Sequence, residues 1–226
     1  MTAPRLGTLP WTPVTEHPEL VAPPVAAALA EVPGDVWVAA IDADLADTAA
    51  FTEAYGVPGE ASANCVVVAA RRAGETRLAA CLVLATTRAD VNGLVRRHLD
   101  ARKASFAPQD VAVTTTGMAF GGITPIGLPA DMPLLVDAAV AASPWLVIGS
   151  GIRGSKLAVA GSTLAGLPGA VVLEGLGRPT GGESPATELP RPARAPDDSD
   201  VGWSERPAAD DDRIYLENRP PHWGRD

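Results

Sequence analysis

Two glycine-rich segments combine the residue types and the spacing most suited to chemistry in this sequence. The first, residues 116–127, reads T-G-M-A-F-G-G-I-T-P-I-G, and the second, residues 149–156, reads G-S-G-I-R-G-S-K. Glycine lets a ligand approach the main chain closely. A loop of this kind can also hold its free N–H groups toward a carbonyl oxygen or an anion. The alternative interpretation of each segment is a tight turn between two strands.

The composition excludes several other kinds of site. The chain of 226 residues has a formal net charge of −9. That charge argues against a broad electrostatic grip on a nucleic-acid backbone, and hence against a DNA partner, but leaves room for a small basic pocket at one end of an RNA. Cys65 and Cys81 lie in apolar runs, and no histidine or further cysteine completes a ligand set. We therefore expect buried thiols, with no metal site and no cofactor.

The N-terminus lacks an apolar signal segment, and no run of about 18 apolar residues indicates a membrane span. A cytoplasmic protein with no membrane contact is the default expectation.

Three parts follow one another along the chain. Residues 1–24 are punctuated by prolines and are expected to wrap the surface, with Trp11 as an anchor. Residues 25–177 form the folded domain. Residues 178–226 hold eight prolines, eleven acidic and seven basic residues, too little apolar surface to fold alone. The tail ends in I-Y-L-E-N-R-P-P-H-W-G, which predicts either a docking motif for a protein partner or an unstructured segment.

Apolar runs predict the elements that must position the two loops. Residues 64–69 and 78–85 are continuous apolar strands joined by a turn around Gly74, which predicts a β-hairpin at the centre of a sheet. Further strands are expected at 36–41, 134–137, 145–148, 156–159 and 170–173. Helices are expected at 25–31, from the N-cap Asp47 to Tyr55, after the N-cap Asp90, and from the N-cap Ser162 to Leu167. Residues 111–115 fit either a strand or a short helix.

The helix after Asp90 carries the densest basic cluster of the chain, Arg96, Arg97, Arg102 and Lys103. A solvated helix face is the usual reading of such a cluster, and a patch beside a phosphate is the functional one. His98 falls on the apolar stripe of this helix, so we expect a packed or half-buried structural histidine.

These blocks resemble, in order, the YbaK family, also called the prolyl-tRNA synthetase-associated editing domain. The matching blocks are the hairpin N-C-V-V-V with L-A-A-C-L-V, the pair T-G at 116–117 followed by G-G-I-T-P-I-G at 121–127, and I-G-S-G-I-R-G-S-K-L at 148–157. The resemblance implies a mixed α/β fold, in which a curved, largely antiparallel sheet is flanked by helices. It also implies hydrolysis of the ester between a wrong amino acid and its tRNA.

The resemblance further implies that the main chain and the substrate perform most of the chemistry. N–H groups of Gly122, Ile123 or Thr124 would polarise the ester carbonyl as an oxyanion hole. The attacking water would be oriented by loop carbonyls and by a ribose hydroxyl. Arg153 suits a phosphate, although a structural pair with a carboxylate such as Asp137 is its alternative. The full expected set is Gly121, Gly122, Ile123, Thr124 and Asn64 for catalysis, and Pro125, Gly127, Ser150, Gly151, Arg153, Lys103 and Lys156 for substrate binding.

The sequence departs from the family at the strand that opens the hairpin. There the family has a functional lysine, and alignment places Asn64 in that position. Asparagine keeps a donor and an acceptor but loses the charge. Lys103 or Lys156 could supply a cation from another direction, and we favour Lys103 because it belongs to the basic cluster. Pocket walls could include Phe51, Phe106, Met118 or Phe120, although core packing is the commoner role of such residues.

Three functions remain open at this stage. The first is a free-standing deacylase that acts in trans on the acceptor end of mischarged aminoacyl-tRNA. The second is a catalytically inactive binding module for an aminoacyl-adenosine or a related small ligand, which the loss of the lysine favours. The third is an adaptor that works through its tail. The retained glycine loop and second glycine turn favour the deacylase.

Overall fold

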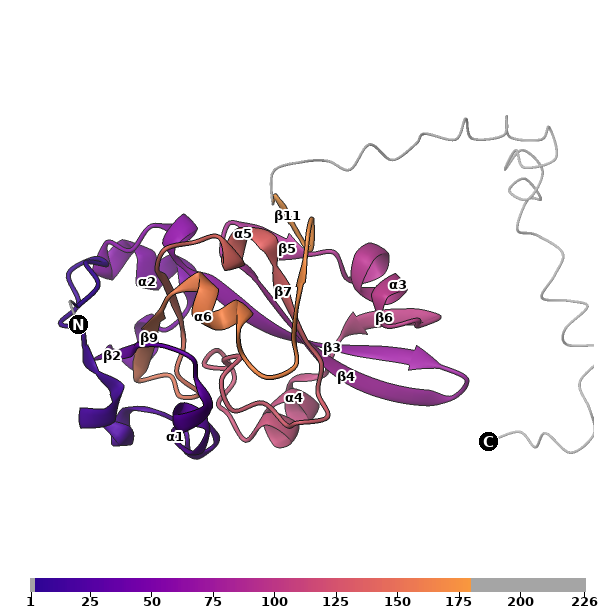
Figure 1. Ribbon diagram of the computed structural model, residues 1–226, viewed down its shortest axis with the longest axis horizontal. Helices are drawn as coiled ribbons and strands as arrows, with labels where there is room; N and C mark the ends of the chain where they lie inside the picture. Colours follow the sequence, from indigo (N-terminus) through magenta and orange to yellow (C-terminus); the bar gives the residue numbers. More distant parts are fainter. Residues whose placement is uncertain (1–2, 180–226) are drawn as a thin grey trace, which may run out of the picture. The chain divides into compact units, whose positions relative to one another are not determined.

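The computed structural model describes residues 3–179, and its strands form two main sheets and a small third one (Figure 1). The first sheet is antiparallel, in the order β1 (Thr12–Pro13), β2 (Val36–Ala40), β9 (Ser155–Val159) and β8 (Leu146–Gly149). The second has the order β10 (Ala170–Leu173), β7 (Leu134–Asp137), β4 (Glu75–Leu84), β3 (Ala63–Arg72) and β6 (Lys103–Phe106). The third pairs β11 (Gly177–Pro179) with β5 (Thr87–Ala89).

The expected mixed α/β class with antiparallel sheets is confirmed, with two details the sequence did not indicate. The strands divide between two main sheets, which a single parallel bridge from Ser62 to Val147 connects. The second sheet is mixed, because β7 runs parallel to both β4 and β10.

The predicted hairpin is the longest element of the fold and forms the middle of the second sheet. β3 and β4 pair over ten positions, from Ala63 opposite Leu84 to Arg72 opposite Glu75. The turn places Ala73 and Gly74 at φ of 50° and 88°. Two successive positive φ angles match the twist of the flanking strands and explain the tight connection. One face of the hairpin packs against the first sheet, and the other is covered by the helical segment after Asp90.

Short helices connect these strands. The α-helices are α1 (Pro23–Ala28), α2 (Thr48–Tyr55), α3 (Arg96–His98), α4 (Gln109–Thr116), α5 (Ala138–Ala141) and α6 (Gly161–Ala165), and a π-helical turn, Val91–Val95, precedes α3. Single 3₁₀ turns span Val14–Glu16, Pro18–Leu20, Leu29–Glu31, Ala43–Leu45 and Gly59–Ala61. The expected cap at Asp90 is confirmed, since its carboxylate accepts from the backbone N–H groups of Gly93 and Leu94, at 3.1 and 2.8 Å.

Several local expectations are wrong. Ala160 and not Ser162 is the N-cap of α6, because the helix starts where the backbone N–H of Gly161 donates to Ser143 O. His98 is exposed, because the π-helical turn rotates the residues after it away from the apolar stripe. Of the two alternatives left open for residues 111–115, the short helix is confirmed, inside α4. Strands β1, β5, β6 and β11 were not expected.

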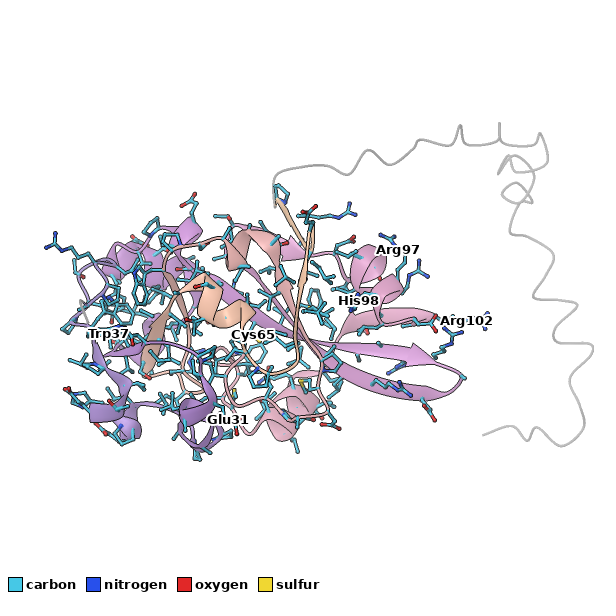
Figure 2. The ribbon with its side chains drawn as sticks, in the orientation of Figure 1. Glu31, Trp37, Cys65, Arg97, His98 and Arg102 are labelled. Atoms are coloured by element: carbon cyan, nitrogen blue, oxygen red, sulfur yellow. The ribbon has the colours of Figure 1, made fainter. Side chains whose placement is uncertain are left out.

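The N-terminal segment lies against the first sheet. Trp11 is 7 % exposed and its indole N–H donates to Leu6 O at 3.0 Å. It packs in a cluster with Trp37 and Phe51, which agrees with the expected anchoring role; Trp37 is labelled in Figure 2. The predicted docking motif of the tail lies outside the described residues.

The two glycine-rich segments are held together by backbone hydrogen bonds. The N–H of Gly151 donates to Gly122 O at 2.7 Å, and the N–H of Ala119 donates to Gly151 O at 2.8 Å. Gly149 lies under the same loop: a Cβ there would be 2.3 Å from Gly122 O and 2.7 Å from Ile123 O. Those oxygens belong to the main chain and cannot rotate away. The close approach therefore requires glycine at position 149.

We predict that Gly149→Ala destabilises the protein by about 2 kcal/mol, because the new methyl group forces the loop away from β8. Urea denaturation of both proteins measures the change. Gly154→Ala is the matched control, because Gly154 belongs to the same turn and its Cβ would meet nothing within 4 Å. Equal losses of stability in the two variants would contradict the close-packing argument.

Candidate functional site

A cavity of about 570 Å³ lies where the two main sheets meet. Its walls come from the start of α2, the first half of β3, the β6–α4 connection, the first glycine loop, and the ends of β8 and β9. Most of the lining is apolar. Its polar side chains are Asp47, Thr48, Ser62, Asn64, Gln109 and Lys156.

Lys156 is the cation of this cavity. It extends from β9, and its ammonium donates to Ala46 O at 2.8 Å and lies 5.3 Å from the centre of the Phe51 ring. Burial, together with the positive charge of Arg153, lowers the pKa of Lys156 to about 8, and the carboxylate of Asp47 partly opposes both effects. At pH 7 the amine is thus still mostly protonated, and one hydrogen bond leaves two of its three donors for a ligand.

Arg153 lies beside the cavity. Its guanidinium is 3.5 Å from the Asp47 carboxylate and donates to Ala43 O at 3.2 Å. The alternative, a structural pair with a carboxylate, is found with Asp47 and not with the suggested Asp137, which instead caps α5 and accepts from the N–H of Gly177 at 2.6 Å. The guanidinium approaches Gly121 so closely that a Cβ there would be 2.7 Å from Nη1. Arg153 therefore forms the outer edge of the glycine loop.

Asn64 lines the cavity from β3. Its side-chain oxygen accepts from the Thr48 hydroxyl at 3.2 Å, which fixes the amide. The next residue, Cys65, also lines the cavity (labelled in Figure 2). Burial raises the pKa of the Cys65 thiol far above its usual range, and the nearby Cys81 adds to the shift. Burial likewise raises the pKa of Cys81 to about 12. Both remain thiols at neutral pH, so neither is an activated nucleophile.

The first glycine loop offers fewer donors than expected. The N–H of Gly122 donates to Ala119 O at 2.9 Å, inside the loop. The N–H of Thr124 points at the sulfur of the buried Met118, at 3.5 Å, and Thr124 itself is fully buried. Both N–H groups therefore form contacts within the fold and are not available to a substrate. Gly121 and Ile123 do line the cavity, and within residues 3–179 their N–H groups have no hydrogen-bond acceptor.

Several other expected binding residues have structural roles. The Ser150 hydroxyl is buried against the hydroxyl of Ser155 at 2.7 Å, and both groups of the Gly151 peptide hold the loop. Pro125 and Gly127 face a separate cavity of about 400 Å³ next to Glu31 (labelled in Figure 2).

Lys103 lies away from the cavity, at the far end of β6 from the lining residue Phe106. Three residues of strand separate the two, about 10 Å. The preference for Lys103 over Lys156 as the cation of the cavity was therefore wrong, because the sequence did not reveal strand β6.

Some lining residues were missed. Asp47 was expected only to cap α2, but its side chain makes no capping hydrogen bond and faces Arg153 instead. The Ser62 hydroxyl is buried with no partner within residues 3–179, and no sequence signal distinguishes it. Of the suggested walls, Phe51, Phe106 and Phe120 line the cavity, whereas Met118 belongs to the core.

Comparison with known proteins agrees with this architecture. The sequence model of the aminoacyl-tRNA editing domain matches residues 42–167, more than half of the chain. The chain belongs to this family. No curated protein sequence matches the chain.

Three solved structures share the fold of this editing domain. One is described as "a putative trans-editing enzyme for prolyl tRNA synthetase"; it is 22% identical, with a TM-score of 0.57 over 67% of this chain and 93% of that one. A hypothetical protein is 19% identical, with a TM-score of 0.56 over 62% of this chain and 90% of that one. A scaffold used for computational epitope grafting is 21% identical, with a TM-score of 0.58 over 68% and 95%.

Within residues 3–179 no helix is both long and apolar enough to cross a membrane, and no group of three or more His, Cys, Asp or Glu could hold a metal ion.

We predict that Asp47→Asn lowers the pKa of Lys156 below about 8, because it removes the one carboxylate that favours the charged amine. Arg153→Gln is expected to raise it, because it removes a like charge. Titration of the Lys156 side-chain NMR signals measures both variants. A pKa that does not move, or shifts of the same sign in both, would contradict the proposed arrangement of charges.

Proposed function

We propose that this editing domain is a trans-acting aminoacyl-tRNA deacylase, which hydrolyses the ester between an amino acid and the 3′-terminal nucleotide of a tRNA. Membership of the editing family supports this activity. The observation that carries the proposal is the meeting of a buried cation, Lys156, with the unpaired N–H groups of Gly121 and Ile123 in one cavity. A cation and oriented donors in an apolar pocket are what an ester needs when negative charge develops on its carbonyl oxygen.

The shape of the cavity suits a small aminoacyl group. Its volume falls in the range of small-molecule sites, and the buried Phe51 and Val147 line it. The aminoacyl side chain would lie against this apolar wall. The Ser62 hydroxyl, buried without a partner within residues 3–179, would donate to or accept from the substrate.

The proposed reaction is a direct attack by water. Water adds to the ester carbonyl carbon, and the resulting oxyanion is stabilised by the N–H of Ile123 and by the charge of Lys156. The ester C–O bond then breaks, the ribose oxygen leaves with a proton, and the amino acid is released. The neighbouring ribose hydroxyl helps to orient the water, so no nucleophilic side chain is required.

Lys156 thus replaces the missing family lysine from a different strand. Asn64 keeps the position on β3, where its amide is fixed by Thr48, and the positive charge now comes from β9. The two residues line the same cavity. We infer that the loss of the lysine on β3 is compensated and does not abolish catalysis.

The decisive assay measures hydrolysis of a panel of tRNAs mischarged with small amino acids. We expect Lys156→Gln to lower kcat/KM about 100-fold, because it removes a charge next to the oxyanion. Arg77→Ala, which changes an exposed residue at the hairpin end, is the control and is expected to retain activity. If the parent protein cleaves none of these esters above background, the inactive binding module for an aminoacyl-adenosine is the correct function.

The pH dependence gives a separate test. With a folded-state pKa of about 8, Lys156 is charged below that value and loses its charge above it. The enzyme-dependent rate, after subtraction of spontaneous ester hydrolysis, should therefore fall as the pH rises through about 8. The fall should be absent in Lys156→Gln. A parent rate that continues to rise above pH 9 would exclude a role for the charged amine.

A further inference from the structure

The chain contains only two lysines, and their surroundings differ sharply. Lys103 is exposed on β6, away from the cavity. Lys156 lines the cavity, where its amine donates to Ala46 O at 2.8 Å and lies 5.3 Å from the centre of the Phe51 ring. One protein thus offers a cavity amine and a surface amine for direct comparison.

Burial has opposite effects on an amine and a thiol that share this cavity, Lys156 and Cys65 (Cys65 is labelled in Figure 2). An apolar environment favours the uncharged form of either group. The uncharged form of Cys65 is the unreactive thiol, and its raised pKa keeps it in that form at neutral pH. The uncharged form of Lys156 is the free amine, which is a nucleophile. The cavity therefore suppresses the thiol and activates the amine.

A neighbouring cation increases this activation. A lysine becomes nucleophilic when it is desolvated in an apolar pocket or lies near a second positive charge. Both conditions are met, because burial, together with the charge of Arg153, lowers the pKa of Lys156 to about 8. About a quarter of the amine is then uncharged at pH 7.5, against roughly one part in a thousand for an ordinary lysine.

The same cavity can hold an acyl group next to this amine. Its volume of about 570 Å³ exceeds that of a short acyl chain such as acetyl or propionyl, and the buried Phe51 and Val147 give it an apolar wall. Gly121 and Ile123, whose N–H groups have no acceptor within residues 3–179, line it as well. Such donors stabilise the oxyanion that forms when a nucleophile attacks a carbonyl group.

We propose that Lys156 is a site of direct acylation by small activated acyl donors, which are thioesters or acyl phosphates. The free amine adds to the acyl carbonyl carbon, and the N–H of Ile123 stabilises the oxyanion. The bond from that carbon to the sulfur, or to the phosphate oxygen, then breaks. The leaving thiolate or phosphate takes up the proton that the nitrogen loses, and a neutral amide remains on Lys156.

Acylation of Lys156 would switch off the proposed reaction. It removes the positive charge of the lysine, so the oxyanion of the tRNA ester loses the cation that stabilises it. This consequence rests on the proposed function, whereas the modification itself does not. The editing site would then respond to the supply of activated acyl groups.

The test is incubation of the full chain with acetyl phosphate or with acetyl-coenzyme A at pH 7.5, followed by mass spectrometry of peptides cleaved at acidic residues. We expect acetylation of Lys156 by at least one donor about tenfold faster than that of Lys103, and the faster donor identifies the source. Hydroxylamine, which cleaves thioesters but not amides, should leave the label in place. Equal rates on both lysines, or labelling of Cys65 in place of Lys156, would overturn the proposal.

Three comparisons show whether the folded cavity causes the preference. In the chain unfolded by guanidinium chloride the two lysines should react equally, because both amines are then in water. Asp47→Asn removes the carboxylate that favours the charged amine and should speed acetylation of Lys156, whereas Arg153→Gln should slow it. A preference that survives unfolding, or rate changes of the same sign in both variants, would count against the role of the cavity.

Deacylase assays then separate the modification from the proposed function. Protein acetylated at Lys156 is expected to lose about 100-fold in kcat/KM on aminoacyl-tRNA, as Lys156→Gln does. Lys156→Arg keeps the charge and cannot form the amide, so the same treatment should leave its own activity unchanged. A loss in that variant would contradict the regulatory role of Lys156. If the parent cleaves no ester, the deacylase fails, and the mass spectra still decide whether Lys156 is acylated.

Discussion

The close contact between the two glycine-rich segments is the constraint on which the cavity depends. The peptide of Gly151 forms hydrogen bonds in both directions with the first loop, and the end of β8 passes directly under Gly122 and Ile123 at Gly149. Any side chain at position 149 would push the first glycine-rich loop away from the end of β8. Because this contact uses the N–H of Gly122 internally, the loop is rigid before a ligand arrives. Gly121 and Ile123, whose N–H groups have no acceptor within residues 3–179, both line the cavity, so a ligand there would meet donors that are already fixed.

The buried cation follows from the same packing. Lys156 lies on β9, opposite Gly149 of β8. Its ammonium is stabilised by the carbonyl of Ala46, by the face of the Phe51 ring and, at longer range, by the carboxylate of Asp47. These partners do not fully replace water, and the pKa of Lys156 falls toward neutrality. An anion or a developing oxyanion in the cavity would supply the missing charge. Arg153, whose positive charge disfavours the charged form of Lys156, pairs with the carboxylate of Asp47.

Sequence reasoning predicted the parts of the fold that local patterns encode. The apolar runs and the turn at Gly74 gave the hairpin, and Asp90 marked a helix start, because both signals depend on residues near in sequence. Strand β6, which was missed, has only four residues, and only one of them is buried. Such a short segment shows no alternation of apolar and polar residues from which a strand could be predicted. For the site, the loop was found but its donors were not, since which N–H groups are free depends on contacts with Met118 and Ala119. Lys156 was named, yet ranked behind Lys103, because only the strand order reveals which lysine faces the cavity.

A small aminoacyl group, the ligand proposed for the cavity, offers few contacts by which it can be recognised. Discrimination among small amino acids has to come from the cavity wall, where each methylene changes the binding free energy by only about 1–3 kcal/mol. Phe106, at one end of the four-residue strand β6, lines that wall, whereas Lys103, at the other end, lies away from the cavity. Differences of this size are recognised only by a wall that keeps its shape. The hydrogen bonds between the two glycine-rich segments fix the part of the wall that the first loop supplies.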